Sequence, residues 1–280
     1  MTYSIVARDA STGELGVAVQ SQAFNAGAAV PWARPGIGAI ATQSFTDRRY
    51  GWRGLELIAD GETPLEALAQ LRADDELVEF RQVAMLDAGG RAAQLTGARC
   101  VPEAGHACGQ DWAAQGNMLA SGEAWHEMGA AFERAKGSLA QRLLAALDAA
   151  EATGGDWRGQ GGAGIVVVPD RGEPWERVLD LRVEEGEGSI VELRRLVDRA
   201  EAYRAANRAE RGRAEIGRAG RLPDTHVLWL SFLDAAGAGD VDEARRLLRE
   251  LERKEPRWRG LVRSLAVHPE APPLEDILGE

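Results

Sequence analysis

The sequence of 280 residues predicts an α+β domain followed by a small all-α domain. Three observations lead to this prediction. Short apolar runs bounded by turn residues indicate strands joined as hairpins, and longer segments with apolar residues at a spacing of 3.6 indicate helices. The two patterns alternate in blocks, which is typical of α+β domains rather than of a regular βαβ chain. Residues 223–280 carry only the helical pattern.

The beginning of the sequence predicts three strands. Ser4–Ala7 and Leu15–Val19 are compact apolar runs separated by turn residues, so they form a predicted β-hairpin. Gly36–Ser44, which is rich in Ile, Ala and Thr, is the third predicted strand. Pro31 and Pro35 bracket a segment just before it, which we predict to be a loop.

The next part of the chain predicts helices, then a second hairpin. Two helical segments fall within residues 51–71, and the second begins with Thr63 as its N-cap and Pro64 at its first position. Gln82–Asp87 and Arg91–Thr96 are predicted strands with a glycine-containing turn between them. The remaining elements predicted before residue 211 are a strand over 112–115, helices over 121–136 and 138–152, strands over 164–168 and 178–183, and a helix over 190–210.

The composition divides the chain into three parts. We predict a main domain over residues 1–209, a linker over 210–222 that has few apolar side chains, and a small helical domain over 223–280. The last part resembles one unit of a helical repeat, with a Gly-Asp turn between two apolar-striped helices and a Pro-x-Trp start to a third. A single unit buries its apolar face poorly, so we expect it to dock on the main domain or on another subunit of a homo-oligomer.

The charge and the cysteine count exclude several classes of protein. A net charge of −11 argues against nucleic acid as a partner, because phosphate binding needs clustered cations. No apolar run approaches the ~20 residues of a membrane span, so no membrane partner is expected. Two cysteines make no disulfide framework, and no basic segment followed by an apolar run begins the sequence. We therefore expect a cytoplasmic protein.

The common catalytic signatures are absent from the sequence. There is no Gly-x-Ser-x-Gly elbow, no phosphate-binding loop and no His-Glu-x-x-His pair. The glycine-rich segment 159–164 precedes a predicted strand, whereas a dinucleotide-binding loop follows one. The four histidines are scattered without the spacing of metal ligands. We expect neither a cofactor nor a metal ion.

Thr2 is the first candidate for chemistry. Methionine aminopeptidase tolerates small second residues, so removal of Met1 would expose a threonine at the terminus. A terminal threonine carries its own base, because its α-amine titrates near ~7.7–8.0 and its neutral form can accept the proton of the hydroxyl. Many cytosolic chains begin in this way without a catalytic role, so the start of the chain does not decide between these two interpretations.

The second candidate is the polar and glycine-rich segment 97–119, which includes His106 and Asn117. Loops that hold His, Gln and Asn among glycines are places where oxyanion donors and substrate contacts occur. A tightly turned connector whose polar side chains bind its own backbone is an equally good interpretation.

Several ungapped blocks resemble a known family. Residues 1–9, 12–19, 36–43 and 115–119 are similar to the bacterial family called domain of unknown function 1028, and the resemblance covers about residues 1–196. The tail resembles a small helical domain that follows in some members and is associated with peptidoglycan binding. The family is grouped with the N-terminal-nucleophile (Ntn) hydrolases, which implies a four-layer αββα sandwich and hydrolysis of amide bonds.

The resemblance also implies roles for individual residues. Thr2 would be the nucleophile at the start of the first strand, and Gln43 lies near the turn that supplies an oxyanion donor. Ser4 is the rival nucleophile, although three residues would have to be removed to make it N-terminal. The candidates for substrate binding are Ser21, Thr42, His106 and Asn117.

Two ionisable residues of proteasome-like relatives have no counterpart here. The lysine that tunes the nucleophile would fall near Ala29, and an acidic residue would fall near Ser21 and Gln22. The sequence argues against a third function, a cell-wall protein that holds peptidoglycan through its tail, because no export signal is visible, and it leaves two functions open. One is an amidohydrolase that uses Thr2 through its own amine, and the other is a catalytically silent scaffold that binds a small ligand or a partner protein.

Overall fold

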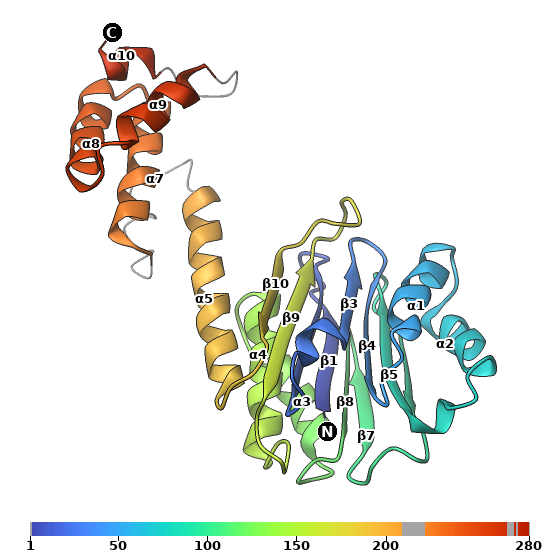
Figure 1. Cartoon of the computed structure of the whole chain (residues 1–280). Helices are drawn as coiled ribbons and strands as arrows, with labels where there is room; N and C mark the ends of the chain where they lie inside the picture. Colours follow the sequence, from blue (N-terminus) through green and yellow to red (C-terminus); the bar gives the residue numbers. More distant parts are fainter. Residues whose placement is uncertain (1, 209–221, 268–271, 273, 280) are drawn as a thin grey trace. The chain divides into compact units, whose positions relative to one another are not determined.

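The computed structural model describes residues 2–208, 222–267, 272 and 274–279. The chain forms two compact units, Met1–Val197 and Asp198–Glu280, each with its own internal contacts. The first unit contains two antiparallel sheets and four helices that cover them (Figure 1). Residues 210–221 of the predicted linker lie outside the described residues, so the domain limits 1–209 and 223–280 remain predictions.

The larger sheet has six strands, and every neighbouring pair in it is antiparallel. Their order across the sheet is β10 (Leu179–Val183), β9 (Gly162–Val168), β2 (Leu15–Ser21), β1 (Thr2–Arg8), β8 (Trp112–Asn117) and β7 (Gly105–Gly109). The first strand of the chain therefore lies in the interior of this sheet, between β2 and β8 (Figure 1).

The smaller sheet has four antiparallel strands. Their order is β3 (Pro31–Arg34), β4 (Gly38–Ser44), β5 (Arg81–Asp87) and β6 (Ala92–Thr96). Two sequence-based predictions are wrong here. The predicted loop between Pro31 and Pro35 is strand β3, which pairs with β4 and packs against β9. The segment 97–119, interpreted as a loop, contains the unpredicted strand β7, whereas the strand predicted over 112–115 is β8, with which β7 pairs.

The two sheets pack face to face, and helices cover their outer faces. The smaller sheet contacts α1 (Arg49–Ala59) and α2 (Pro64–Ala73), and the larger sheet contacts α3 (Ala124–Arg134) and α4 (Leu139–Ala152) (Figure 1). The predicted start of α2 is confirmed, because the side chain of Thr63 accepts a hydrogen bond from the amide of Glu66 and Pro64 begins the helix. The short 3₁₀ helices η1 (Ala26–Ala28) and η2 (Val78–Phe80) lie in the connections.

The alternation of side chains along the strands builds the core. One set of buried apolar side chains fills the space between the sheets, and includes Val6, Val17 and Leu86. A second set, which includes Ile40 and Met85, packs the smaller sheet against α1 and α2. These apolar layers fix the position of each sheet on the other. A residue at a strand end therefore has a defined neighbour in the opposite sheet.

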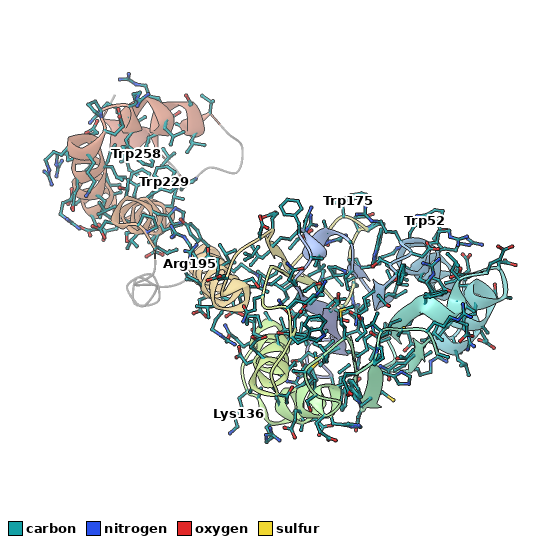
Figure 2. All side chains as sticks on the ribbon, turned by 60° about the horizontal axis from the view of Figure 1, so that its bottom comes forward. Trp52, Lys136, Trp175, Arg195, Trp229 and Trp258 are labelled. Atoms are coloured by element: carbon teal, nitrogen blue, oxygen red, sulfur yellow. The ribbon has the colours of Figure 1, made fainter. Side chains whose placement is uncertain are left out.

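The second unit is helical, as predicted. Helix α5 (Ser189–Arg208) begins in the first unit, and the helices that follow are α7 (Asp224–Gly237), α8 (Val241–Lys254), α9 (Trp258–Ala266) and the unpredicted short α10 (Glu275–Leu278). Trp229 and Trp258 pack against its core with ring centroids 5.1 Å apart (Figure 2). Among the helices that the structure describes, none combines the length and apolar character needed to cross a membrane.

Candidate functional site

One end of the layer between the sheets is polar. Five strands that are otherwise apolar on this face contribute buried polar side chains there, and we call this set the polar end. It consists of Thr2 and Ser4 from β1, Ser21 from β2, Gln43 from β4, Gln82 from β5, and Gln115 and Asn117 from β8. None of the seven is more than 8% exposed, so nearly all of their hydrogen bonds must be made within the protein.

Thr2 is held at this end through both its hydroxyl and its backbone. Its Oγ1 donates a hydrogen bond to Ser21 Oγ over 3.0 Å. Its carbonyl oxygen accepts from Gln43 Nε2 at 3.1 Å and from Asn117 Nδ2 at 3.4 Å. The pairing of β1 explains these contacts, because Thr2 lies opposite Ser21 on one side and Asn117 on the other. The structure thus brings together four of the residues selected from the sequence.

Ser4, the rival nucleophile, lies deeper in the same layer. Its Oγ donates to Gln43 Oε1 over 2.7 Å and accepts from Gln115 Nε2 over 3.3 Å. The residue has no exposed surface, whereas Thr2 at the start of the strand is 8% exposed. Ser4 therefore links the two sheets, because Gln43 lies in the smaller sheet and Gln115 in the larger one.

Gln82, like Gln115, belongs to the polar end but was not selected as a candidate from the sequence. Its Oε1 accepts from both Gln43 Nε2 (2.8 Å) and Asn117 Nδ2 (2.9 Å). Its Nε2 lies 2.7 Å from the carbonyl oxygen of Gly116, so it also links the smaller sheet to β8. A glutamine at an inward-facing position of an apolar strand, directly opposite Gln43, is the signal that indicates it.

Two of the candidate substrate-binding residues lie outside this set. Thr42 points to the other face of β4, where its hydroxyl donates to the carbonyl of Asp47 over 3.0 Å. His106 is exposed on β7, and its Nδ1 lies 2.8 Å from Thr96 Oγ1, which in turn accepts from Gln82 Nε2 at 3.0 Å. Desolvation lowers the pKa of His106. The side chain of His106 therefore reaches the polar end through Thr96, while its backbone pairs with that of Gln115 in β8.

The backbone at the polar end adopts unusual conformations. Ser44 and Met118 have φ values of 68° and 60°, in the left-handed region that non-glycine residues rarely occupy. Each directly follows a site residue, Gln43 and Asn117 respectively. Such a conformation costs on the order of 1 kcal/mol and persists where the surrounding contacts enforce it. Ser44 still pairs with Arg81 as the last residue of β4, and Met118 is the first residue after β8.

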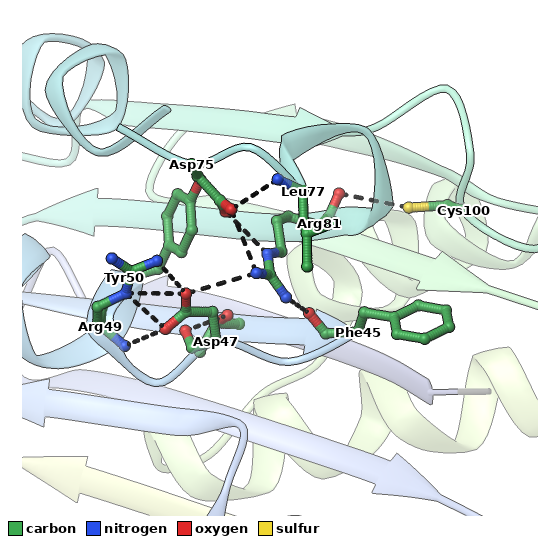
Figure 3. Close-up of polar contacts among 9 residues, drawn as sticks. Phe45, Asp47, Arg49, Tyr50, Asp75, Leu77, Arg81 and Cys100 are labelled. Carbon is green, nitrogen blue, oxygen red and sulfur yellow. Dashed lines mark hydrogen bonds and ion pairs between the residues drawn. The ribbon is translucent and has the colours of Figure 1, made fainter. Parts of the chain in front are cut away.

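A buried ion pair fixes the loops beside the polar end (Figure 3). Arg81, which precedes Gln82, donates from Nε to Asp75 Oδ2 over 2.8 Å and from Nη1 to the carbonyl of Phe45 over 2.6 Å. Asp75 also accepts from the hydroxyl of Tyr50. The hydrogen bond from Arg81 lowers the pKa of Asp75 to about 2. This cluster ties the chain that leaves β4 to the chain that enters β5.

Neither lysine of the sequence is among the seven residues that form the polar end. Lys136 lies exposed in the connection between α3 and α4 (Figure 2), and Lys254 is exposed at the end of α8 in the second unit. The described residues contain no group of three or more His, Cys, Asp or Glu side chains arranged to hold a metal ion.

Comparisons with known proteins agree with this fold. Residues 2–193 match the model of a family described as "Family of unknown function (DUF1028)". A crystal structure of a Silicibacter pomeroyi protein assigned to the same family aligns with a TM-score of 0.65 and 29% sequence identity, over 71% of this chain and 88% of that one. No protein with curated annotation is similar enough in sequence to count as a match.

Proposed function

Because the chain belongs to the DUF1028 family, whose function is unknown, we propose its function from the polar end: hydrolysis of a small amide or related C–N bond by Thr2 after removal of Met1. Met1 itself lies outside the described residues. The observation that carries the proposal is the placement of Thr2, whose hydroxyl is bound by Ser21 and whose carbonyl is bound by two side-chain amides at the start of an interior strand.

The reaction follows from the chemistry of a terminal threonine. The neutral α-amine takes the proton of the Thr2 hydroxyl as Oγ1 adds to the substrate carbonyl. The C–N bond then breaks, the proton passes to the leaving nitrogen, and an ester on Thr2 remains. A water molecule hydrolyses the ester and regenerates the hydroxyl. Gln43 and Asn117 donate hydrogen bonds to the carbonyl oxygen of Thr2 and so hold its backbone in place. Oγ1 is therefore held in one orientation before it attacks the substrate.

The arrangement of the sheets supports assignment to the Ntn-hydrolase superfamily. Two antiparallel sheets lie face to face with helix pairs on their outer faces, which is the layer order of the αββα sandwich. The candidate nucleophile begins the first strand, and that strand lies in the interior of its sheet. The absence of a lysine from the polar end assigns the role of the base to the amine of Thr2 alone.

The first test determines the state of the terminus and the reactivity of Thr2. Intact-mass measurement of the protein purified from its native cells should show that Met1 is missing. A small β-lactone should then add its full mass, because Oγ1 opens the ring to form an ester and the hydroxyl proton passes to the released alkoxide. We expect labelling in wild type and in Thr2→Ser, and none in Thr2→Ala. Retention of Met1, or labelling of Thr2→Ala, would refute the proposal.

A second function competes with this one. The amides of the polar end bind one another and the backbone, and Thr2 is almost entirely buried, which also suits a catalytically silent scaffold that binds a small ligand or a partner protein. A screen with small amides, with Thr2→Ala as the control, separates the two. Hydrolysis that is lost in the variant supports the enzyme, and a ligand bound equally by both proteins supports the scaffold.

We also propose that the protein acts in the cytoplasm as a homo-oligomer on a small-molecule substrate. The support for oligomerisation is the short helical unit, which has only a small core of its own. Light scattering coupled to gel filtration tests this proposal. A mass equal to one chain at every concentration would contradict it.

A further inference from the structure

Exposed apolar side chains gather in the loops at the polar end. Phe24 after β2, Phe45 after β4 and Trp157 before β9 are 69%, 59% and 64% exposed, and Leu77 lies exposed in the connection that leads to β5. In the described loops at the opposite end of the sheets, Trp175 between β9 and β10 is the one large apolar side chain that is exposed (Figure 2). We call Phe24, Phe45 and Trp157 the aromatic rim.

Two members of the aromatic rim leave directly from residues that bind Thr2. Phe24 comes three residues after Ser21, whose Oγ accepts the hydrogen bond of the Thr2 hydroxyl. Phe45 comes two residues after Gln43, whose side-chain amide donates to the carbonyl oxygen of Thr2. The first belongs to the larger sheet and the second to the smaller one, so the chains that carry the two rings leave from two sides of Thr2.

The loop that carries Trp157 is bound to the loop that carries Phe24. The amide of Gln22, two residues before Phe24, donates a hydrogen bond to Asp156 Oδ2 over 2.9 Å. Trp157 is the next residue, and it lies in a turn that is closed by the amide of Gly159, which donates to the carbonyl of Asp156 over 2.8 Å. The third ring of the rim is therefore fixed to the same side of the site as the first.

Phe45 is exposed and nevertheless held in place. Its amide donates to the carbonyl of Phe80 over 3.3 Å, and its carbonyl accepts from Arg81 Nη1 at 2.6 Å. Its ring packs edge-on against that of Phe80 with centroids 5.4 Å apart, and it points away from the ion pair of Arg81 (Figure 3). An exposed ring that is already fixed loses little conformational freedom when a ligand covers it, which favours binding.

The size of the aromatic rim indicates a small ligand. Each ring can cover about 200 Å² of a partner. Three rings therefore fall short of the roughly 800 Å² that each side of a stable protein interface buries. The rim is also continuous with the polar end, since its loops begin at residues that hold Thr2. Aromatic side chains of this kind pack best against planar apolar groups.

We propose that Phe24, Phe45 and Trp157 bind a planar apolar group that lies beside the C–N bond of the substrate, so that the preferred substrate is an amide with an aromatic substituent. The inference rests on the proposed function, which supplies the bond that Thr2 breaks. The rim binds this group without any reaction at Thr2, so its occupancy can be measured separately from hydrolysis.

The experiment measures occupancy of the rim by fluorine NMR. The full chain carries 5-fluorotryptophan at its tryptophans and the change Thr2→Ala, which prevents turnover, and the variants Trp157→Phe and Trp175→Phe identify two of the resonances. We expect phenylacetamide or N-benzylacetamide at millimolar concentration to shift the Trp157 resonance, and acetamide to leave it unchanged. The aromatic amide that acts at the lower concentration shows which side of the C–N bond carries the group.

A variant on the other side of the rim tests whether the rings act on the same ligand. Phe45→Ser removes the ring next to the smaller sheet, so the concentration of ligand that produces half of the Trp157 shift should rise about fivefold. The matched control is Trp52→Ser, which removes a similarly exposed ring from α1 and should leave that concentration unchanged (Figure 2).

Several outcomes would overturn the inference. These are an unshifted Trp157 resonance, an equal shift of the Trp175 resonance, and a half-shift concentration that is the same with and without Phe45. A Trp157 resonance that moves when the protein alone is diluted would make the rim a contact between copies of the chain and would also overturn it. The proposed function fails separately: a saturable Trp157 shift without β-lactone labelling of Thr2 refutes the hydrolase, and labelling without the shift refutes the rim.

Discussion

The two ends of the layer between the sheets are built from the same strands and differ only in the residues that the strands present. At one end β1, β2 and β5 contribute Val6, Val17 and Leu86. At the polar end the same strands contribute Thr2, Ser21 and Gln82. The backbone pairing is equally regular at both ends. The fold therefore does not require polar side chains at the polar end, because apolar side chains fill the space between the sheets a few residues further along the same strands.

The comparison separates stability from function. Apolar side chains stabilise the layer by leaving water, whereas a buried amide contributes only if its hydrogen bonds are replaced. The polar end replaces most of them, yet Gln115 Oε1 is buried without a hydrogen-bond partner among the described residues. A region that keeps amides where Leu or Val would fit is the expected location of a site.

The largest effect is expected from the ion pair that borders the polar end. Asp75→Ala leaves the guanidinium of Arg81 buried without its main partner, so we expect the free energy of unfolding to fall by about 3–5 kcal/mol. Urea denaturation followed by circular dichroism measures this. A loss below about 1 kcal/mol would show that the loops beside the polar end do not depend on this pair.

The apolar end should show a loss of stability without a loss of reactivity. Leu86→Ala removes a fully buried side chain between the sheets and should lower the free energy of unfolding by about 3 kcal/mol. The rate at which a β-lactone labels Thr2 should stay within about twofold of wild type below the unfolding transition. A tenfold slower rate in this variant would contradict the separation of the two ends.

The pH dependence of stability tests the ion pair between Asp75 and Arg81 at acidic pH. The pKa of Asp75 is about 2 in the folded protein, below its ordinary value of 3.8, because Arg81 stabilises the carboxylate. Its contribution is therefore complete above about pH 4 and is lost as the pH falls toward 2. We expect Asp75 to account for roughly 2 kcal/mol of the acid destabilisation. The difference between wild type and Asp75→Asn in denaturation series at pH 5 and pH 2 should shrink by that amount.

The smallest change in stability should accompany a large change in reactivity. Gln82→Leu removes the acceptor shared by Gln43 and Asn117, and the apolar replacement offsets part of the cost, so about 1–2 kcal/mol should be lost. The two amides then lose the contact that aims them at the carbonyl of Thr2. Labelling of Thr2 should slow by about tenfold, as expected for a displaced nucleophile. Unchanged labelling would assign Gln82 to packing alone.

The sequence predicted the elements whose signals are local. The N-cap Thr63 with Pro64 after it, and the glycine-turned hairpin of β5 and β6, depend on neighbouring residues and were placed correctly. Strand β3 was missed because it has four residues that begin with a proline, and its pairing partner β4 and packing partner β9 lie elsewhere in the chain. Strand β7 was missed because its glycines and polar residues carry no strand pattern of their own.

The candidate site was predicted in the same uneven way. The resemblance of sequence blocks indicated Thr2, Ser21, Gln43 and Asn117, which the structure places together. Gln82 was not selected, because a single polar residue in an apolar strand shows its role only when the register with Gln43 is known. Thr42 was selected with its neighbour, but the alternation of the strand turns it to the opposite face.

The interior position of β1 has a consequence for the order of events during synthesis. Asn117, the partner of Thr2 in β8, is made 115 residues later, which takes several seconds at roughly 5–20 residues per second. Until then the larger sheet lacks β8, and β1 has only its hairpin partner β2 beside it. The removal of Met1 that the proposed function requires would therefore take place before β8 completes the larger sheet beside Thr2. The order of the strands thus allows Met1 to be removed before β1 pairs with β8 and Thr2 is buried.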